Sequence, residues 1–430
     1  MYLDKVKQFF KKLNFKSFVL IFLLFFGIMP IIPRAVSTYL TTYSYMALVV
    51  AVVLFTIVAC RIANVRDFIL FSLPFILYQL IVLLFNRSDE ILLAGYQVLL
   101  FLMPAFIGYY LVTHPFYSQV YTSVIVIAYL ITGITTIIGC MKYPNAARVL
   151  ATTASSQDPT AVLYDWNNIG GYQFVYSMVL LYPFVILAFK MKRLHIIPTV
   201  IITVIAYSVV ITASYSYAFI LLMVSTLLFF IPRNITLKRF VLLTLLFVLI
   251  AILFRTTVAA IMSSLGEYLG NSTMTDKINA IFLGKDAIEG FDDNRGELYM
   301  LSIKAFLNNP LFGNFFTGRN LTGGHSFILD NLGNFGLIGG GVMLFMYRGI
   351  FRTFVKPLKD QAGYCFVLWA FIQPFILSTI NTGMWLDNLC LFTPIILCFI
   401  YGRDIYLSRV DEKPTPLVQV NVLKSKVRNE

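Results

Sequence analysis

His325 is the histidine with the most unusual position in this sequence. The chain has 3 histidines, and His114 and His195 lie at the predicted ends of apolar segments. His325 instead lies within Gly323-Gly324-His325-Ser326-Phe327, where a long polar segment gives way to an apolar one. An imidazole can take a proton from a hydroxyl near neutral pH. A lone histidine is often structural, but this position makes His325 a candidate general base.

Two arginines lie in the same polar segment as His325. Arg295 and Arg319 precede it in the chain, and a guanidinium group suits bidentate contact with phosphate oxygens. The apolar segment that follows would begin a helix, whose N-terminus attracts anions such as a diphosphate. The alternative for both arginines is contact with lipid headgroups or with carboxylates of the same segment.

Asp330 and several glycines follow His325 in the apolar segment. A carboxylate inside an apolar helix needs a partner, so Asp330 is either a substrate contact or a hydrogen-bonding residue in helix packing. Gly333, Gly336 and Gly340 lie three and four residues apart. This spacing gives a smooth face for close packing on a neighbouring helix, and we expect these glycines to position the site without touching a substrate.

No residue pattern in the chain indicates a metal or an organic cofactor. Asp286, Glu289, Asp292 and Asp293 form no tight ligand pattern and are typical of a solvated acidic run. The 5 cysteines fall in or beside apolar segments, as small packing residues do. We therefore predict neither a required metal nor a cofactor.

The composition identifies the medium that surrounds these candidates. Hydrophobic residues make up 59% of the 430 residues and charged residues only 12%, and the mean hydropathy is +0.81. Such a chain is typical of an integral membrane protein. The net charge of +13 does not indicate nucleic-acid binding, because the basic residues lie between apolar segments and form no stripe.

Apolar segments long enough to cross a hydrocarbon core recur along the whole chain. We predict an all-α, polytopic single membrane domain over residues 1–430 with about twelve spans. The predicted spans are 17–33, 43–60, 68–85, 91–112, 119–140, 172–189, 195–213, 216–232, 239–254, 326–347, 361–380 and 386–402.

The basic residues indicate the orientation of these spans. With a cytoplasmic N-terminus, every short basic connection falls inside, including Lys190/Lys192/Arg193 and Arg348/Arg352. Both termini are then cytoplasmic, and residues 403–430 form a polar cytoplasmic tail. An odd error in the number of spans would move some of the basic connections outside.

Two predicted extracytoplasmic segments, 141–171 and 255–325, are longer than a connection requires. Long segments in a compact fold are usually functional. In the second, Asn294 and Glu297 resemble a capping box, and Pro310 would end the helix that follows. We expect 255–325 to hold two or three short helices and the chemistry.

A family resemblance rests on several short stretches within and around the two long segments. Pro310-Leu311-Phe312-Gly313 follows the helix that begins near Arg295, and His325-Ser326-Phe327 leads into Gly333-Asn334-Phe335-Gly336. Upstream, Arg148 is followed by Asp165-Trp166-Asn167-Asn168. Together they resemble the bacterial superfamily of Wzy-type polysaccharide polymerases and O-antigen ligases, from the fifth predicted span onward.

The resemblance implies a GT-C-like membrane glycosyltransferase of the bacterial inner membrane. Such enzymes transfer a glycan from undecaprenyl diphosphate, without a metal, at the extracytoplasmic face, with a flippase and a chain-length regulator as partners. His325 would align with the family's loop histidine and Arg295 with the arginine before the loop helix. The family's Ser-Arg is here Ser214-Tyr215, so Tyr215 stands where an arginine is expected and is a candidate substrate contact. Three cations are candidates to replace it: Arg148, Arg255 and Arg319.

The sequence is compatible with several functions. A polymerase would extend a capsular, O-antigen or exopolysaccharide chain on a lipid-linked repeat unit, whereas a ligase would differ only in its acceptor. A flippase for lipid-linked oligosaccharides would need broken helices and charges near the middle of the membrane, and few charges lie inside these spans. A scaffold role would leave the long segment 255–325 without a purpose.

Overall fold

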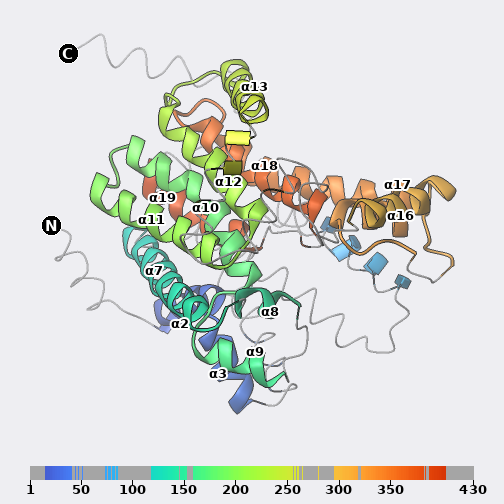
Figure 1. Ribbon diagram of the computed structural model, residues 1–430, viewed down its shortest axis with the longest axis horizontal. Helices are drawn as coiled ribbons and strands as arrows, with labels where there is room; N and C mark the ends of the chain where they lie inside the picture. The colour runs from blue at the N-terminus through green and yellow to red at the C-terminus, as the bar shows by residue number, and fades with distance from the viewer. Residues whose placement is uncertain are drawn as a thin grey trace, which may run out of the picture.

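The computed structural model describes residues 15–40, 118–144, 146–152, 158–254, 295–317, 321–381 and 387–402, with isolated positions between 44 and 85, between 256 and 279, and at 383. All regular structure in these residues is helical (Figure 1). The expectation of an all-α protein is therefore confirmed for the described part of the chain.

Helix α10, Tyr172–Lys190, lies at the centre of the helical bundle. Nearly all of its residues from Phe174 to Ala188 are buried, because other helices cover it on every side. The helices that pack directly on it are α11 (Ile196–Thr212), α12 (Ser216–Thr226), α18 (Tyr364–Ile380) and α19 (Asp387–Tyr401). Helix α7, Ser118–Lys142, covers α11 and α19 from outside.

The outer helices carry stripes of exposed apolar side chains. On α7 the exposed residues are Ile127, Ile131, Ile134 and Ile138, at alternating spacings of four and three. Such a stripe follows one face of a helix, and water would not favour it. Among the described helices, α7, α10 and Phe327–Ile350 are long and apolar enough to cross a membrane, and a bent pair near the N-terminus would make a fourth.

That bent pair replaces the first predicted span. Helix α2, Phe15–Ile28, ends before Pro30, and α3, Ile31–Tyr39, leaves at an angle of 106°. Proline lacks a backbone N–H and breaks the helical hydrogen-bond ladder, which explains why the predicted span 17–33 does not continue. Helix α3 packs on α9 of the first long segment.

The predicted boundaries agree with the structure for most of the described spans. Five predicted spans match helices of the structure. In chain order they are 119–140 (α7), 172–189 (α10), 195–213 (α11), 361–380 (α18) and 386–402 (α19). The range 216–232 is α12 followed by a 3-10 turn, Leu227–Phe230, and 239–254 is α13, Leu237–Leu253. The spans predicted at 43–60, 68–85 and 91–112 lie outside the continuously described residues.

Both long segments contain helices. The segment 141–171 holds α8, Ala146–Thr152, and α9, Pro159–Trp166, which the sequence reading did not predict. In 255–325 the helix predicted after Asn294 is present as α16, Arg295–Asn308. It packs along α17, Phe327–Ile350, and the two helices extend away from the bundle beside α18 (Figure 1).

Helix α17 is broken at Gly336. This residue has φ 60° and ψ −156°, a conformation outside the helical region. The N–H groups of Leu337 and Ile338 donate to the carbonyls of Pro310 and Leu311, at 2.8 and 3.4 Å. The turn after α16 thus supplies the acceptors that a continuous helix would have supplied, as buried backbone requires.

Candidate functional site

Three tyrosine rings meet where α10 and α12 begin, and we call Tyr172, Tyr176 and Tyr215 the tyrosine cluster. Tyr172 and Tyr176 lie one turn apart on α10, with ring centroids 4.7 Å apart. The ring of Tyr215, at the N-cap of α12, lies 5.0 Å from that of Tyr172 and 5.8 Å from that of Tyr176. Tyr176 and Tyr215 are buried, with 1% and 6% of their surface exposed, so the cluster packs the starts of the two helices together.

Arg295 approaches the tyrosine cluster from α16. The half-buried side chain places its guanidinium carbon 5.7 Å from the ring centroid of Tyr217, within the range of a cation–π contact. Its charge also acts on the hydroxyl of Tyr172. The predicted phosphate-binding arginine therefore lies beside the tyrosine cluster.

Arg148 approaches the same cluster from α8. Its charge acts on Tyr215, whose hydroxyl donates a hydrogen bond to the carbonyl of the adjacent residue, Ala147, at 2.5 Å. Burial raises the pKa of Tyr215 well above its ordinary value, and Arg148 only partly opposes this. Tyr215 therefore stays protonated and acts as a hydrogen-bond donor that fastens α8 to α12.

Of the three cations considered for the place of the family arginine, the structure brings Arg148 to Tyr215. Arg255 and Arg319 lie outside the described residues, as does the acidic run from Asp286 to Asp293. A cation thus lies near the position where Tyr215 stands, on a different element of the chain.

Asn381 connects the tyrosine cluster to the helix that follows His325. It ends α18, and its side-chain oxygen accepts from the hydroxyl of Tyr172 at 2.6 Å, while its side-chain nitrogen donates to the hydroxyl of Tyr176 at 3.4 Å. Its backbone carbonyl accepts from the N–H of Phe327, the first residue of α17, at 2.8 Å. Tyr299 of α16 donates to the neighbouring carbonyl of Ile380 at 3.0 Å.

His325 is exposed and lies two residues before Phe327. Gly323, two residues before His325, lies against the first turn of α16, because a Cβ atom there would be 2.2 Å from the carbonyl oxygen of Leu298. The segment that carries His325 therefore lies within one helical turn of Arg295 along α16. The structure brings the two predicted catalytic residues to the same end of α16 and α17.

Asp330 fixes the shape of the His325 segment. One carboxylate oxygen accepts from the hydroxyl of Ser302 at 2.5 Å and from the N–H of Gly324 at 3.2 Å. The other accepts from the N–H of Ser326 at 3.0 Å, and Ser326 in turn caps α17 by accepting from the N–H of Leu329. The structure therefore supports the packing alternative for Asp330, since its oxygens are used within the protein.

The three glycines of α17 that lie three and four residues apart do not all pack against a neighbouring element. Gly333 packs on α16, where an added Cβ would be 3.0 Å from the carbonyl oxygen of Ser302 and 3.3 Å from Cβ of Ala305. Gly336 lies so close to Leu311 that a Cβ would be 2.4 Å from its carbonyl group. Gly340 instead lies against Leu332 of its own helix, so the face predicted for packing extends over two of the three glycines.

The sequence predicted Tyr215 as a site residue, but it did not predict Tyr172, Tyr176 or Asn381. The available signal was the recurrence of tyrosine at the predicted outer ends of two spans, in Tyr172-x-x-x-Tyr176 and Tyr215-x-Tyr217. Asn381 also follows an apolar span directly. Neither signal indicates which spans lie side by side, which is what joins these residues.

Comparison of the chain with protein-family models, with curated proteins and with solved structures found no match. Within the described residues, no three His, Cys, Asp or Glu side chains are grouped as a metal site would need. Cys140, Cys365, Cys390 and Cys398 are buried free thiols.

The arrangement combines two guanidinium groups, aromatic rings and an exposed imidazole. Guanidinium groups can hold an anion with several oxygens, and the largely buried tyrosine rings pack together the helices beside which these groups lie. An exposed imidazole next to an anion site can accept a proton from a neighbouring hydroxyl. Transfer of a group from an anionic leaving group to a hydroxyl is the chemistry that this set suits.

Proposed function

We propose that this chain is a membrane glycosyltransferase, a Wzy-type polysaccharide polymerase that transfers a glycan from undecaprenyl diphosphate onto a lipid-linked repeat unit. One observation carries the proposal: Arg148 and Arg295, from separate elements, both act on tyrosines of the same group, beside the segment that holds His325. A diphosphate leaving group needs this kind of cationic stabilisation.

In the proposed reaction the arginines bind the donor's diphosphate. His325 takes the proton from the acceptor hydroxyl, whose oxygen then bonds to the anomeric carbon of the donor glycan. The bond from that carbon to the phosphate oxygen breaks, and undecaprenyl diphosphate leaves with the electron pair. The acceptor attacks from the face opposite to the leaving group, so the configuration at the anomeric carbon inverts.

We further propose the membrane arrangement that this reaction requires. The chain would cross a bacterial inner membrane about twelve times, with both termini cytoplasmic and the tyrosine cluster at the extracytoplasmic face. The donor and acceptor lipids would enter from the bilayer. A flippase would deliver repeat units, and a chain-length regulator would act on the product.

An O-antigen or wall-polymer ligase is the nearest alternative, because it uses the same donor and the same leaving group. Only the acceptor differs between the two reactions. A polymerase and a ligase would share the proposed site chemistry, so identification of the product distinguishes the two functions.

A flippase is favoured by one structural observation, the break in α17 at Gly336. Transporters use broken helices to expose backbone groups to a substrate. Here, however, the N–H groups of Leu337 and Ile338 donate to the turn after α16. These groups are therefore used within the protein, and the break serves packing of α16 on α17.

The length of the polymer in a deletion strain tests the proposal. The strain is complemented with the wild type, with His325→Ala or with Arg295→Ala, and Lys304→Ala, an exposed residue of α16, serves as the control. Each variant is checked for its level in the membrane by immunoblot. We expect His325→Ala and Arg295→Ala to leave single repeat units, while Lys304→Ala retains the full ladder.

Two results would contradict the proposal. Long chains in both site variants at normal membrane levels would exclude the proposed site. A ladder that is unchanged between the deletion strain and the complemented wild type would favour a ligase or a flippase. Loss of a ligase would leave finished polymer outside the membrane, whereas loss of a flippase would leave repeat units inside.

A further inference from the structure

Tyr217, the second residue of α12, provides the aromatic ring that Arg295 contacts. The guanidinium carbon of Arg295 lies 5.7 Å from the centroid of this ring. The attraction between a guanidinium group and a ring face is electrostatic, because the face of the ring is negative. The contact therefore depends on the electrons of the ring, and an aliphatic side chain would not replace it.

The backbone that carries Tyr217 is held by buried neighbours. Tyr215 and Ser216, which precede it, are each 6% exposed, and the hydroxyl of Tyr215 donates to the carbonyl of Ala147. Tyr217 is itself partly buried and packs against the hydrophobic core. The ring of Tyr217 is therefore fixed to the helical bundle.

Arg295 is placed differently, because it is the first residue of α16. One turn later, on the same face of this helix, Tyr299 donates to the carbonyl of Ile380 at 3.0 Å and so fixes α16 against the end of α18. The side chain of an arginine nevertheless has many rotamers, and ordering it costs conformational entropy. A guanidinium group that binds an anion in one geometry therefore needs a contact that restricts its rotamers.

An aromatic ring can orient a guanidinium group without cancelling its charge. A carboxylate in the same place would compete with phosphate oxygens for the guanidinium N–H groups. Glu297 is the acidic residue in the first turn of α16, but residues two positions apart do not face each other on a helix. The ring of Tyr217 thus suits an arginine that binds a charged ligand.

We propose that Tyr217 is a positioning residue, whose ring face orients the guanidinium group of Arg295 toward the diphosphate of the donor lipid. The inference rests on the proposed glycosyltransferase function, which gives Arg295 a diphosphate to bind. Tyr217 acts through Arg295 and touches no reacting atom. A preoriented charge stabilises a leaving group more than a mobile one does, because it need not reorganise during the reaction.

Fluorination of the ring tests the proposal with little change in side-chain size. Phenylalanine with no, one, two or three ring fluorines replaces Tyr217 in the full chain, which is reconstituted in nanodiscs with an undecaprenyl-diphosphate-linked repeat unit. Each fluorine withdraws electrons and weakens the negative face of the ring. We expect Tyr217→Phe to keep kcat/KM within about two-fold of wild type, and trifluorination to lower it about ten-fold in roughly equal steps.

Two further variants separate the ring face from the volume that it fills. Tyr217→Leu keeps an apolar side chain without a ring and should lower kcat/KM about ten-fold. The loss should fall on the same parameter, KM or kcat, that Arg295→Ala changes, because Tyr217 acts through Arg295. In a chain that already carries Arg295→Ala, neither Tyr217→Leu nor trifluorination should lower kcat/KM further.

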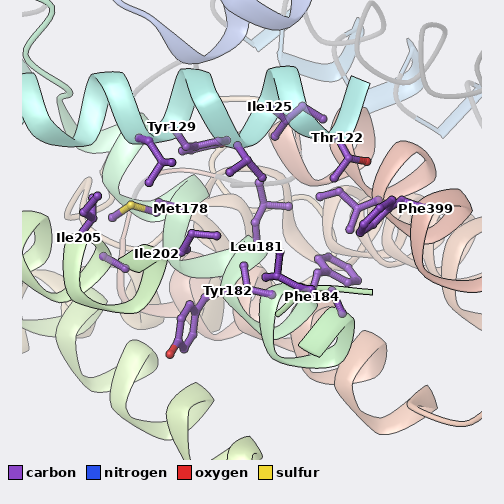
Figure 2. Close-up of a pocket in the computed structure, with 17 residues that line it drawn as sticks. Thr122, Ile125, Tyr129, Met178, Leu181, Tyr182, Phe184, Ile202, Ile205 and Phe399 are labelled. Carbon is purple, nitrogen blue, oxygen red and sulfur yellow. The ribbon is translucent and has the colours of Figure 1, made fainter. Parts of the chain in front are cut away.

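Two controls measure general effects on the bundle. Phe219 lies on the same helix, with its ring edge-on to that of Tyr207, and its fluorination should leave kcat/KM unchanged. Leu181 of α10 lines a cavity of about 90 Å³ between α7, α10, α11 and α19 (Figure 2), about 14 Å along the helix from Tyr172. Leu181→Ala enlarges this cavity and should lower the melting temperature without changing kcat/KM.

A kcat/KM that does not depend on the number of fluorines, in a chain that loses activity with Arg295→Ala, would overturn the positioning role alone. This holds even if Tyr217→Leu does not reach the membrane or is less active, since a loss without fluorine dependence would assign Tyr217 to packing. Binding of undecaprenyl diphosphate, measured by native mass spectrometry, separates this result from failure of the proposed function. Wild type that neither binds this lipid nor forms polymer would contradict both.

Discussion

The hydroxyl of Tyr172 donates a hydrogen bond to the side-chain oxygen of Asn381 at 2.6 Å, which holds the start of α10 to the end of α18. The backbone carbonyl of Asn381 also binds the first N–H of α17. One residue thus joins the tyrosine cluster to the helix that follows His325. The position of His325 relative to the cluster depends on this connection.

We expect Asn381→Ala to loosen this connection and to shorten the polymer. The change removes the acceptor of the Tyr172 hydroxyl and a donor to the Tyr176 hydroxyl, and the loss of a buried hydrogen bond costs about 1–3 kcal/mol. Tyr172→Phe removes one hydroxyl and should cost about 1 kcal/mol. Thermal unfolding in detergent measures both, and the double variant should lose less than the sum of the two. Strict additivity would indicate that the two side chains do not interact.

Gly336 should tolerate no side chain. Gly336→Ala would place a Cβ 2.4 Å from the carbonyl of Leu311, at a residue with φ 60°. We expect a loss of stability of about 2–4 kcal/mol, through overpacking together with backbone strain. Gly341→Ala is the matched control, since open space surrounds Gly341 on the same helix, and it should stabilise α17 by about 0.5–1 kcal/mol. Equal melting temperatures for the two variants would show that α17 is not broken at Gly336.

Asp330→Asn should disorder the segment of His325 with little change in side-chain volume. The carboxylate accepts from Ser302, Gly324 and Ser326, whereas an amide nitrogen in place of one oxygen would face a donor. We expect a stability loss of about 2–3 kcal/mol and faster amide hydrogen exchange over residues 323–327. Glu297→Gln on α16, an exposed carboxylate, should change neither. Unchanged exchange in Asp330→Asn would assign the order of the segment to other contacts.

The helices of the bundle could be predicted from the sequence because each apolar range reports on its own residues. The boundaries of α7, α10 and α11 follow from hydropathy alone. The helix after Asn294 follows from local capping chemistry and from Pro310. These signals do not depend on tertiary packing, so the sequence alone was sufficient to predict these helices.

The breaks and junctions depend on packing between distant residues. Gly336 is one of several glycines in a helical range, and the sequence does not indicate that Leu311 will approach it. Pro30 did offer a local signal for the bend between α2 and α3. The interaction between Arg148 and Tyr215 joins residues from α8 and α12, and hydropathy gives no information on which helices are neighbours.

The stability of the first long segment should depend on the protonation of Asp165. Burial raises the pKa of this carboxyl in α9, and the charge of Arg34 only partly opposes the shift. Because the folded pKa is raised, the contribution of this group favours folding at low pH and is lost as the pH rises through the folded pKa. Asp165→Asn should therefore raise the melting temperature at pH 8 relative to wild type, with a smaller difference at pH 4. A lower melting temperature at pH 8 would mean that attraction to Arg34 exceeds the effect of burial.

Arg148 should be required for donor binding if it supplies the cation missing at Tyr215. In a reconstituted assay with an undecaprenyl-diphosphate-linked repeat unit, we expect Arg148→Gln to reduce kcat/KM by about 100-fold or more, since a charge that stabilises a leaving group is lost. Arg148→Lys keeps the charge but not the bidentate geometry, and an intermediate loss of about 10-fold is expected. Arg193→Gln, at the opposite end of α10 and α11, is the control and should retain the wild-type rate. Full activity in Arg148→Gln would leave Arg295 as the cation of the described site that binds the diphosphate.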